Sequence, residues 1–201
     1  MFMNLNTNKL FYVRNLQKKI YFPNDEFVSA LFMLEKFLFD NYSFTEEVPL
    51  KILKQKWIYE SIEKDDYAND ITKNFKVFEE LDIKQKVLNL IECFSAIPNI
   101  KNIEAFLKNF QSFNEKFNLL ISRKKSPKSS SLKTSILFQF VLLTYIKKFP
   151  INLITNEKYF RADVNHDLFE TVFIEIFKKK NIFRISKSYY LFKLILKLIR
   201  G

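Results

Sequence analysis

Glycine is almost absent from this chain, which has one glycine, Gly201, among 201 residues. Glycine supplies the positive φ angles of tight hairpin turns and the close backbone approach of phosphate-binding loops. With one glycine, neither the GxGxxG pattern of dinucleotide-binding folds nor the GxxxxGK[ST] pattern of P-loops is present. Sheet-rich folds and glycine-dependent nucleotide sites are therefore not expected.

Cysteine and histidine are also scarce, with one residue of each. The single Cys93 rules out a disulfide or a cysteine-based zinc cluster within this sequence, and its apolar helical surroundings are typical of a small buried hydrophobe. The single His166 lies beside Asp167, and Asp163 or Asn165 as the N-cap of a following helix explains the pattern without chemistry. We therefore predict no cofactor, no metal and no enzymatic activity.

Long apolar runs are missing as well. The longest extends from Ser135 to Ile146, is interrupted by Gln139, and is shorter than the ~20 residues that a membrane-spanning helix needs. The first 22 residues hold four cations and no acid but lack the apolar core of a secretory signal. Both a transit peptide and a basic tail that lies on a partner fit them, and we assign residues 1–24 as a basic N-terminal tail.

Positive charge is abundant, and it is unevenly distributed. Residues 1–100 contain 13 Lys/Arg and 15 Asp/Glu, a net charge of −2, whereas residues 101–201 contain 20 and 7, a net charge of +13. Codon bias toward lysine would raise the charge throughout the chain. The asymmetry instead indicates a basic side that faces nucleic acid, although a merely soluble lysine-rich surface is the simpler alternative.

Apolar residues at intervals of three and four predict helices over most of residues 25–201. We expect an all-α fold, a single bundle of about six or seven helices. The polar stretch 60–74 is expected to be a loop, and the serine- and lysine-rich stretch 122–135 an exposed basic loop. The predicted helices cover about 25–39, a second helix from a capping box at Ser43 and Glu46 to about 63, then 75–97 as one or two helices, 101–117, 132–149, 164–179 and 186–200.

Two of these predicted helices have an assigned inward face. In the second, Leu50, Leu53, Trp57 and Ile58 are expected to point into the core. In the last, the inward residues are expected to be Tyr189, Phe192, Ile195, Leu196 and Ile199, opposite a basic stripe.

The basic residues suited to neutralise phosphates cluster in the serine-rich loop and in the last two helices. A flat anionic membrane is the alternative partner for basic amphipathic helices, but the spread of the charges over a loop and several helix ends favours folded RNA. The predicted RNA-contacting residues are Ser122, Arg123, Lys124, Lys125, Lys128, Lys133, Lys178, Lys179, Lys180, Arg184, Lys187, Lys193, Lys197 and Arg200.

The order of these features resembles the seventh small-subunit ribosomal protein family over roughly residues 25–200. The segment Phe39-Asp40-Asn41-Tyr42-Ser43-Phe44-Thr45-Glu46-Glu47 is similar to that family's first interhelical turn, with Asn41 in place of a glycine. The segment that Ala105 opens leads into Ser122-Arg123-Lys124, similar to the family's serine-arginine-arginine motif. Lys133 to Lys148 matches the next helix in length and pattern. The family's hairpin arm is replaced by the serine loop, and its basic and histidine signature before the terminal helix is absent.

The resemblance implies a helical RNA-binding domain over residues 25–201 that binds ribosomal RNA in the head of the small subunit, among neighbouring ribosomal proteins in a large hetero-oligomeric assembly. The heavy use of Lys, Asn, Ile and Phe, which have A/T-rich codons, favours the mitochondrial matrix or the cytoplasm of an A/T-rich small-genome organism. The alternatives are an accessory subunit of another large organellar complex and a nucleic-acid-binding protein outside the ribosome.

Overall fold

The computed structural model describes residues 12–41, 48–96, 103–123, 133–147, 167–179 and 186–200. These ranges contain helices and no strand, which confirms the expected all-α fold. None of the described helices is long and apolar enough to cross a membrane. The elements are α2 (Tyr12–Tyr21), α3 (Glu26–Asn41), α4 (Val48–Glu63), the 3₁₀ helix η1 (Thr72–Phe78), α5 (Leu81–Ala96), α6 (Ile103–Ser122), α7 (Ile136–Lys147), α8 (Leu168–Lys179) and α9 (Lys187–Arg200).

Short polar side chains set where four of these helices begin. The Asp25 carboxylate accepts the Val28 N–H at 2.9 Å before α3, and the Ser135 hydroxyl accepts the Phe138 N–H at 3.1 Å before α7. The Asp167 carboxylate accepts the Phe169 N–H before α8, and the Ser186 hydroxyl accepts the Tyr189 N–H before α9. Each cap satisfies a backbone donor that has no partner within the helix. Asp167 therefore takes the role that the sequence suggested for Asp163 or Asn165, which lie outside the described residues.

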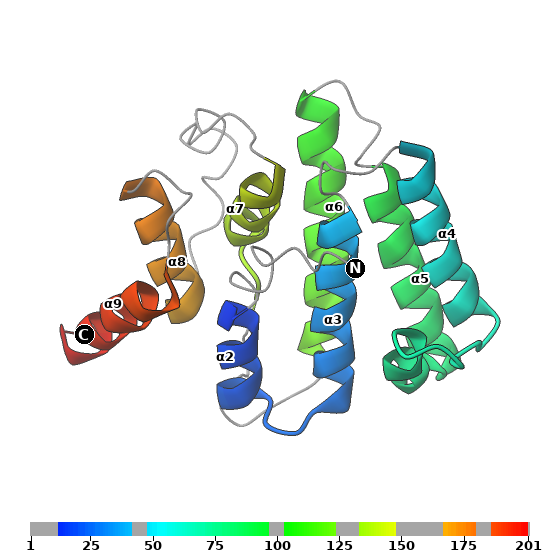
Figure 1. Cartoon of the computed structure of the whole chain (residues 1–201), viewed down its shortest axis with the longest axis horizontal. Coiled ribbons are helices and arrows are strands. Elements are labelled where there is room, and N and C mark those ends of the chain that lie inside the picture. Colours follow the sequence, from blue (N-terminus) through cyan, green and yellow to red (C-terminus); the bar gives the residue numbers. More distant parts are fainter. Residues whose placement is uncertain are drawn as a thin grey trace.

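Helices α3 and α6 occupy the middle of the bundle (Figure 1). On one side α5 packs along α6, and α4 covers α5, with η1 between α3 and α4. On the other side α2 and α7 pack against α3, α8 packs against both α2 and α7, and α9 contacts α8 at the edge of the molecule (Figure 1). Where the described residues test them, the predicted helix borders are correct to within a few residues, except that α6 continues to Ser122, because Leu120 and Ile121 are also buried. The borders predicted at about 97, 101, 149 and 164 lie outside those residues.

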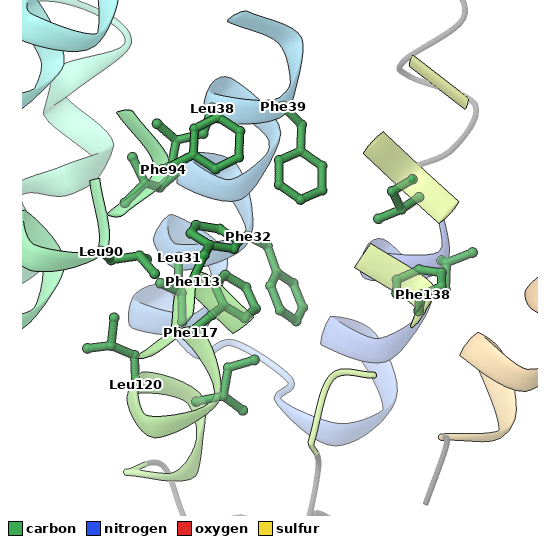
Figure 2. Close-up of a cluster of buried hydrophobic side chains, with 14 of the residues drawn as sticks. Leu31, Phe32, Leu38, Phe39, Leu90, Phe94, Phe113, Phe117, Leu120 and Phe138 are labelled. Atoms are coloured by element: carbon green, nitrogen blue, oxygen red, sulfur yellow. The ribbon is translucent and has the colours of Figure 1, made fainter. Parts of the chain in front are cut away.

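Phenylalanine fills the core. On α6, Phe106, Phe110, Phe113 and Phe117 recur at helical spacing and are buried. Phe39 of α3 lies against this row, with ring centroids 5.9 Å from Phe113. Phe94 of α5 completes the cluster, 5.1 Å from Phe113 and edge-on to it (Figure 2). Such aromatic pairs add about 0.5–1.5 kcal/mol each beyond burial of their area, so these rings bind α3, α5 and α6 together.

Residues Tyr12–Tyr21, assigned from sequence to a basic tail, form instead the integral helix α2. Tyr12, Val13 and Arg14 are buried there. The difference arises because the charge of Arg14 is used inside the protein, where acids distant in sequence meet it, and a charge pattern read along the chain does not reveal such partners. Residues 1–11 lie outside the described part of the chain.

Arg14 is the centre of a buried polar network. Its Nε and Nη2 donate to the two carboxylate oxygens of Glu35 on α3 at 2.7 and 2.8 Å. Its Nη1 donates to Glu170 on α8 at 2.8 Å and to Gln17 at 2.8 Å. The guanidinium also lies 4.8 Å from the ring centroid of Phe138 on α7. The planar, five-donor guanidinium suits such a two-sided contact, which joins four helices.

The network continues through neutral side chains. Gln139 of α7 donates to Glu35 at 2.6 Å and accepts from Asn114 of α6 at 2.9 Å. The Ser135 N–H at the start of α7 donates to Glu170 at 2.8 Å. Because polar atoms buried in this way lose water, each needs its partner, and the set holds α2, α3, α6, α7 and α8 in one relative position.

The expected inward face of α4 is largely wrong. Ile58 is buried as predicted, but Leu53 is 61% exposed, and Leu50 and Trp57 are exposed as well. The buried face is Gln55, Ile58, Ser61 and Ile62. Apolar residues occur on both sides of α4, so their spacing alone allows either side to face inward. An apolar stripe of Leu50, Leu53 and Trp57 consequently lies on the surface.

The expected inward face of α9 is wrong for Phe192, Ile195 and Ile199, whereas Tyr189 and Leu196 are partly buried. Its buried residues are Tyr190 and Leu194, whereas Phe192, Ile195, Leu198 and Ile199 are exposed. The Tyr190 hydroxyl donates to the Phe169 carbonyl of α8 at 2.9 Å and its ring lies edge-on to Tyr12. The narrow edge that carries the tyrosine therefore anchors α9, and the broader apolar face is left outside.

We predict that Arg14→Ala destabilises the fold strongly. Removal of the guanidinium leaves Glu35 and Glu170 buried without their cation, a loss of about 3–5 kcal/mol for a broken buried ion pair. Urea unfolding followed by circular dichroism measures the change. Lys19→Ala, at an exposed position of the same helix, is the control and should cost no more than about 0.5 kcal/mol. Equal effects of the two variants would show that the network contributes nothing.

A second prediction concerns pH. Burial raises the pKa of the Glu170 carboxyl from 4.5 to about 7, with Arg14 and the Ser135 N–H opposing the shift. The folded state therefore binds more protons than the unfolded state between these values, so the contribution of Glu170 to stability falls as pH rises from 4.5 to about 7. The free energy of unfolding, measured across this range, should decline less in Glu170→Gln than in the wild type. Parallel curves would contradict the assignment.

Candidate nucleic-acid interface

The last helix carries only positive charge. Helix α9 contains Lys187, Lys193, Lys197 and Arg200 and no acidic residue. The neighbouring α8 ends in the exposed Lys178 and Lys179, where cations are also favoured by the helix dipole. Of the two acids of α8, Glu170 is buried, so little negative charge offsets these cations at the surface.

A groove of about 230 Å³ runs between α8 and α9. Its walls combine apolar side chains, the Tyr189 ring and a set of four cations. The Lys193 ammonium lies 5.6 Å from the centroid of the Tyr189 ring. The cations that line the groove are Lys179, Lys193, Lys197 and Arg200.

One of these cations is used within the protein. Lys197 donates to Glu175 of α8 at 2.5 Å, an exposed ion pair across the groove. Within the described residues, Lys179, Lys193 and Arg200 have no carboxylate partner. Three cations around an apolar floor suit a phosphate-bearing strand, because phosphates are neutralised by Lys and Arg while sugars or bases contact apolar surface.

A second basic groove, of about 350 Å³, lies between α5 and α6. It is lined by Ser122 and Arg123, which the sequence singled out, and by Lys86 and Lys116, which it did not. Lys86 belongs to the net-negative half of the chain and Lys116 stands alone in sequence, so neither produced a charge signal. Their placement together follows from the packing of α5 along α6.

Asp82 lowers the net positive charge of this groove. Its carboxylate pairs with Lys86 at 2.7 Å and with Arg123. The hydrogen bonds from Lys86 and Arg123 hold the pKa of Asp82 below its ordinary value. All three groups are partly or well exposed, so the ion pairs contribute little to stability. The net positive charge of the groove is reduced by one.

The structure brings six of the predicted RNA-contacting residues into these two grooves. Lys133, Lys178 and Lys187 are exposed but line neither groove, and Ser122 donates its hydroxyl to the Leu119 carbonyl at 3.0 Å. The remaining predicted residues, Lys124, Lys125, Lys128, Lys180 and Arg184, lie outside the described residues.

Other candidate chemistry is weaker. Cys93 is partly buried rather than fully buried, with its sulfur 3.6 Å from the Ser112 hydroxyl. Among the described residues, no three His, Cys, Asp or Glu side chains are grouped so as to hold a metal ion. His166 lies outside that part of the chain.

Comparison of this chain with models of protein families, with curated proteins and with solved structures returned no match. The resemblance to the seventh small-subunit ribosomal protein family, carried by Ser122-Arg123-Lys124 and the neighbouring segments, therefore stays a prediction.

Proposed function

We propose that this protein is a structural component of the head of a small ribosomal subunit, in a mitochondrion, and that it binds ribosomal RNA. The observation that carries the proposal is the pair of cationic grooves, at α8/α9 and at α5/α6, in a chain whose second half has a net charge of +13. Its mechanism is scaffolding, in which phosphate neutralisation holds RNA strands against a fixed helical shape and no bond is made or broken.

The placement of the two grooves supports a large structured partner. Helices α8 and α9, which line one groove, lie at one edge of the molecule, and α5, which lines the other groove together with α6, lies on the far side of α6 from them (Figure 1). A small anionic ligand fills one groove at a time, whereas folded RNA presents phosphates at many separated points of one surface. The buried Arg14 network keeps α2, α3, α6, α7 and α8 in register, which fixes the spacing between the two sites.

An accessory subunit of another large complex is the second candidate function. It is favoured by the exposed apolar stripe of Leu50, Leu53 and Trp57 on α4, because patches of this kind mark contacts with other proteins. The stripe is also compatible with a ribosomal protein that contacts its neighbours. RNA affinity and its dependence on salt separate the two candidates.

We predict that the triple variant Lys179→Ala, Lys193→Ala, Arg200→Ala binds structured small-subunit RNA more weakly than the wild type. Each lost phosphate contact should also reduce the slope of log affinity against log salt by about one. Fluorescence anisotropy with a labelled RNA of the small-subunit 3′ domain, at several salt concentrations, measures both quantities.

The matched control for this triple variant is Lys56→Ala, Lys64→Ala, Lys73→Ala. These three lysines are exposed, lie in the net-negative half and pair with Glu60 or Asp70. Its RNA affinity should equal that of the wild type. The proposal fails if wild-type affinity is insensitive to salt, or if both triple variants lose affinity equally. Co-sedimentation of the wild type with small ribosomal particles tests the ribosomal part separately.

Asp82→Asn should have the opposite effect. It removes the carboxylate that pairs with Lys86 and Arg123, so both cations of the α5/α6 groove become available to phosphates. We expect tighter RNA binding and a steeper salt dependence, by about one unit of slope, in the same anisotropy titration. Asp70→Asn, which frees Lys73 away from either groove, is the control, and an equal gain there would exclude a specific role for the α5/α6 groove.

A further inference from the structure

The outward side of α9 is the most exposed apolar surface among the described residues. Phe192 is 56% exposed, Ile195 54%, Leu198 60% and Ile199 76%. Their spacing of three, six and seven residues from Phe192 places them on one face of the helix. The seven steps from Phe192 to Ile199 extend about 10 Å, half of the about 21 Å length of α9, and the four side chains form a continuous stripe over this half.

Cations border this stripe on both sides. In helical projection Lys187 lies on one side of the apolar stripe, and Lys193 and Arg200 lie on the other side. Lys193 and Arg200 also line the α8/α9 groove. The anchored edge of α9, Tyr190 and Leu194, faces the protein. Seen from outside, α9 therefore presents an apolar centre with positive margins and no acid.

We propose that the outward face of α9 docks on an anionic phospholipid bilayer. A helix that lies in the plane of a membrane buries apolar side chains at the boundary between headgroups and acyl chains, while lysines and arginines at its margins contact anionic headgroups. The exposed stripe and its positive margins match both parts of that surface. The docking residues do not include Lys197, which is paired with Glu175.

The charges of α9 argue for this occupant over a second copy of the chain. Face-to-face pairing of two α9 helices would bring together Lys187, Lys193 and Arg200 of each copy, six cations without an acid on either helix, and like charges oppose such a contact. RNA accounts for the cations and for a ring such as Phe192, on which a base can stack, but the aliphatic Ile195, Leu198 and Ile199 offer no ring for stacking. An anionic membrane accounts for both.

Vesicle co-sedimentation of the full-length, RNA-free protein tests the proposal. The protein should sediment with vesicles of phosphatidylcholine and phosphatidylserine, and not with phosphatidylcholine alone. Ile195→Ser with Ile199→Ser should reduce the bound fraction at least about tenfold, because the change removes two of the four apolar side chains of the stripe. Neither residue lines the RNA groove, so RNA affinity should stay at the wild-type value.

The matched control is Ile52→Ser with Leu53→Ser. These residues are also exposed and apolar, but they lie on α4, so this variant should sediment as the wild type does. The proposal is overturned if the α9 variant binds vesicles normally, if the α4 variant loses binding equally, or if the α9 change abolishes self-association or RNA binding instead. The last two results would assign the stripe to a second copy or to RNA.

A fluorescent reporter distinguishes insertion from simple electrostatic adsorption. The chain has one tryptophan, Trp57 on α4, so Trp57→Phe with Phe192→Trp moves the only indole into the stripe, at its N-terminal end. Its emission should shift to shorter wavelength with anionic vesicles. Sedimentation without a shift would mean that another basic surface adsorbs to the lipid, and would overturn the docking of α9.

Discussion

The fold depends on one buried cation. Arg14 satisfies Glu35 of α3 and Glu170 of α8 at once, and Phe138 of α7 covers the guanidinium. Burial of the Glu170 carboxyl away from water raises its pKa, and the neighbouring Arg14 guanidinium only partly offsets this shift. A charge cluster of this kind is costly unless every donor and acceptor is matched, so it tolerates few arrangements of the helices and thereby selects one.

Burial of charged side chains in the Arg14 network changes the net charge of the surface. Glu170 of α8 is buried, so the exterior around α8 and α9 is more positive than the sequence of those helices indicates. Arg14 is withdrawn as well, so the cations near the start of the chain do not all belong to a basic tail. The same packing that buries these charges leaves Lys179, Lys193 and Arg200 around a groove at the surface.

The sequence predicted where most of the helices lie, but not which face of α4 and of α9 is buried. The spacing of apolar residues predicts a helix because residues three and four apart in sequence lie on one helical face. Capping by Asp25 and Ser186 is likewise local, because each bonds a residue three positions later. Which side of α4 or α9 is buried depends on the neighbouring helix, and both have apolar residues on more than one side. Lys86 and Arg123 line one groove because α5 packs along α6, a contact between segments distant in sequence.

By itself, then, the sequence determined the helical class, most helix borders, the near absence of glycine-dependent sites and the concentration of positive charge after residue 100. Only the tertiary structure decided that Arg14 is a core residue, that α9 is anchored by Tyr190, and that the apolar stripe from Phe192 to Ile199 remains outside. The physical reason is that composition and periodicity are properties of one segment, whereas burial of a charge or a face requires a partner from another.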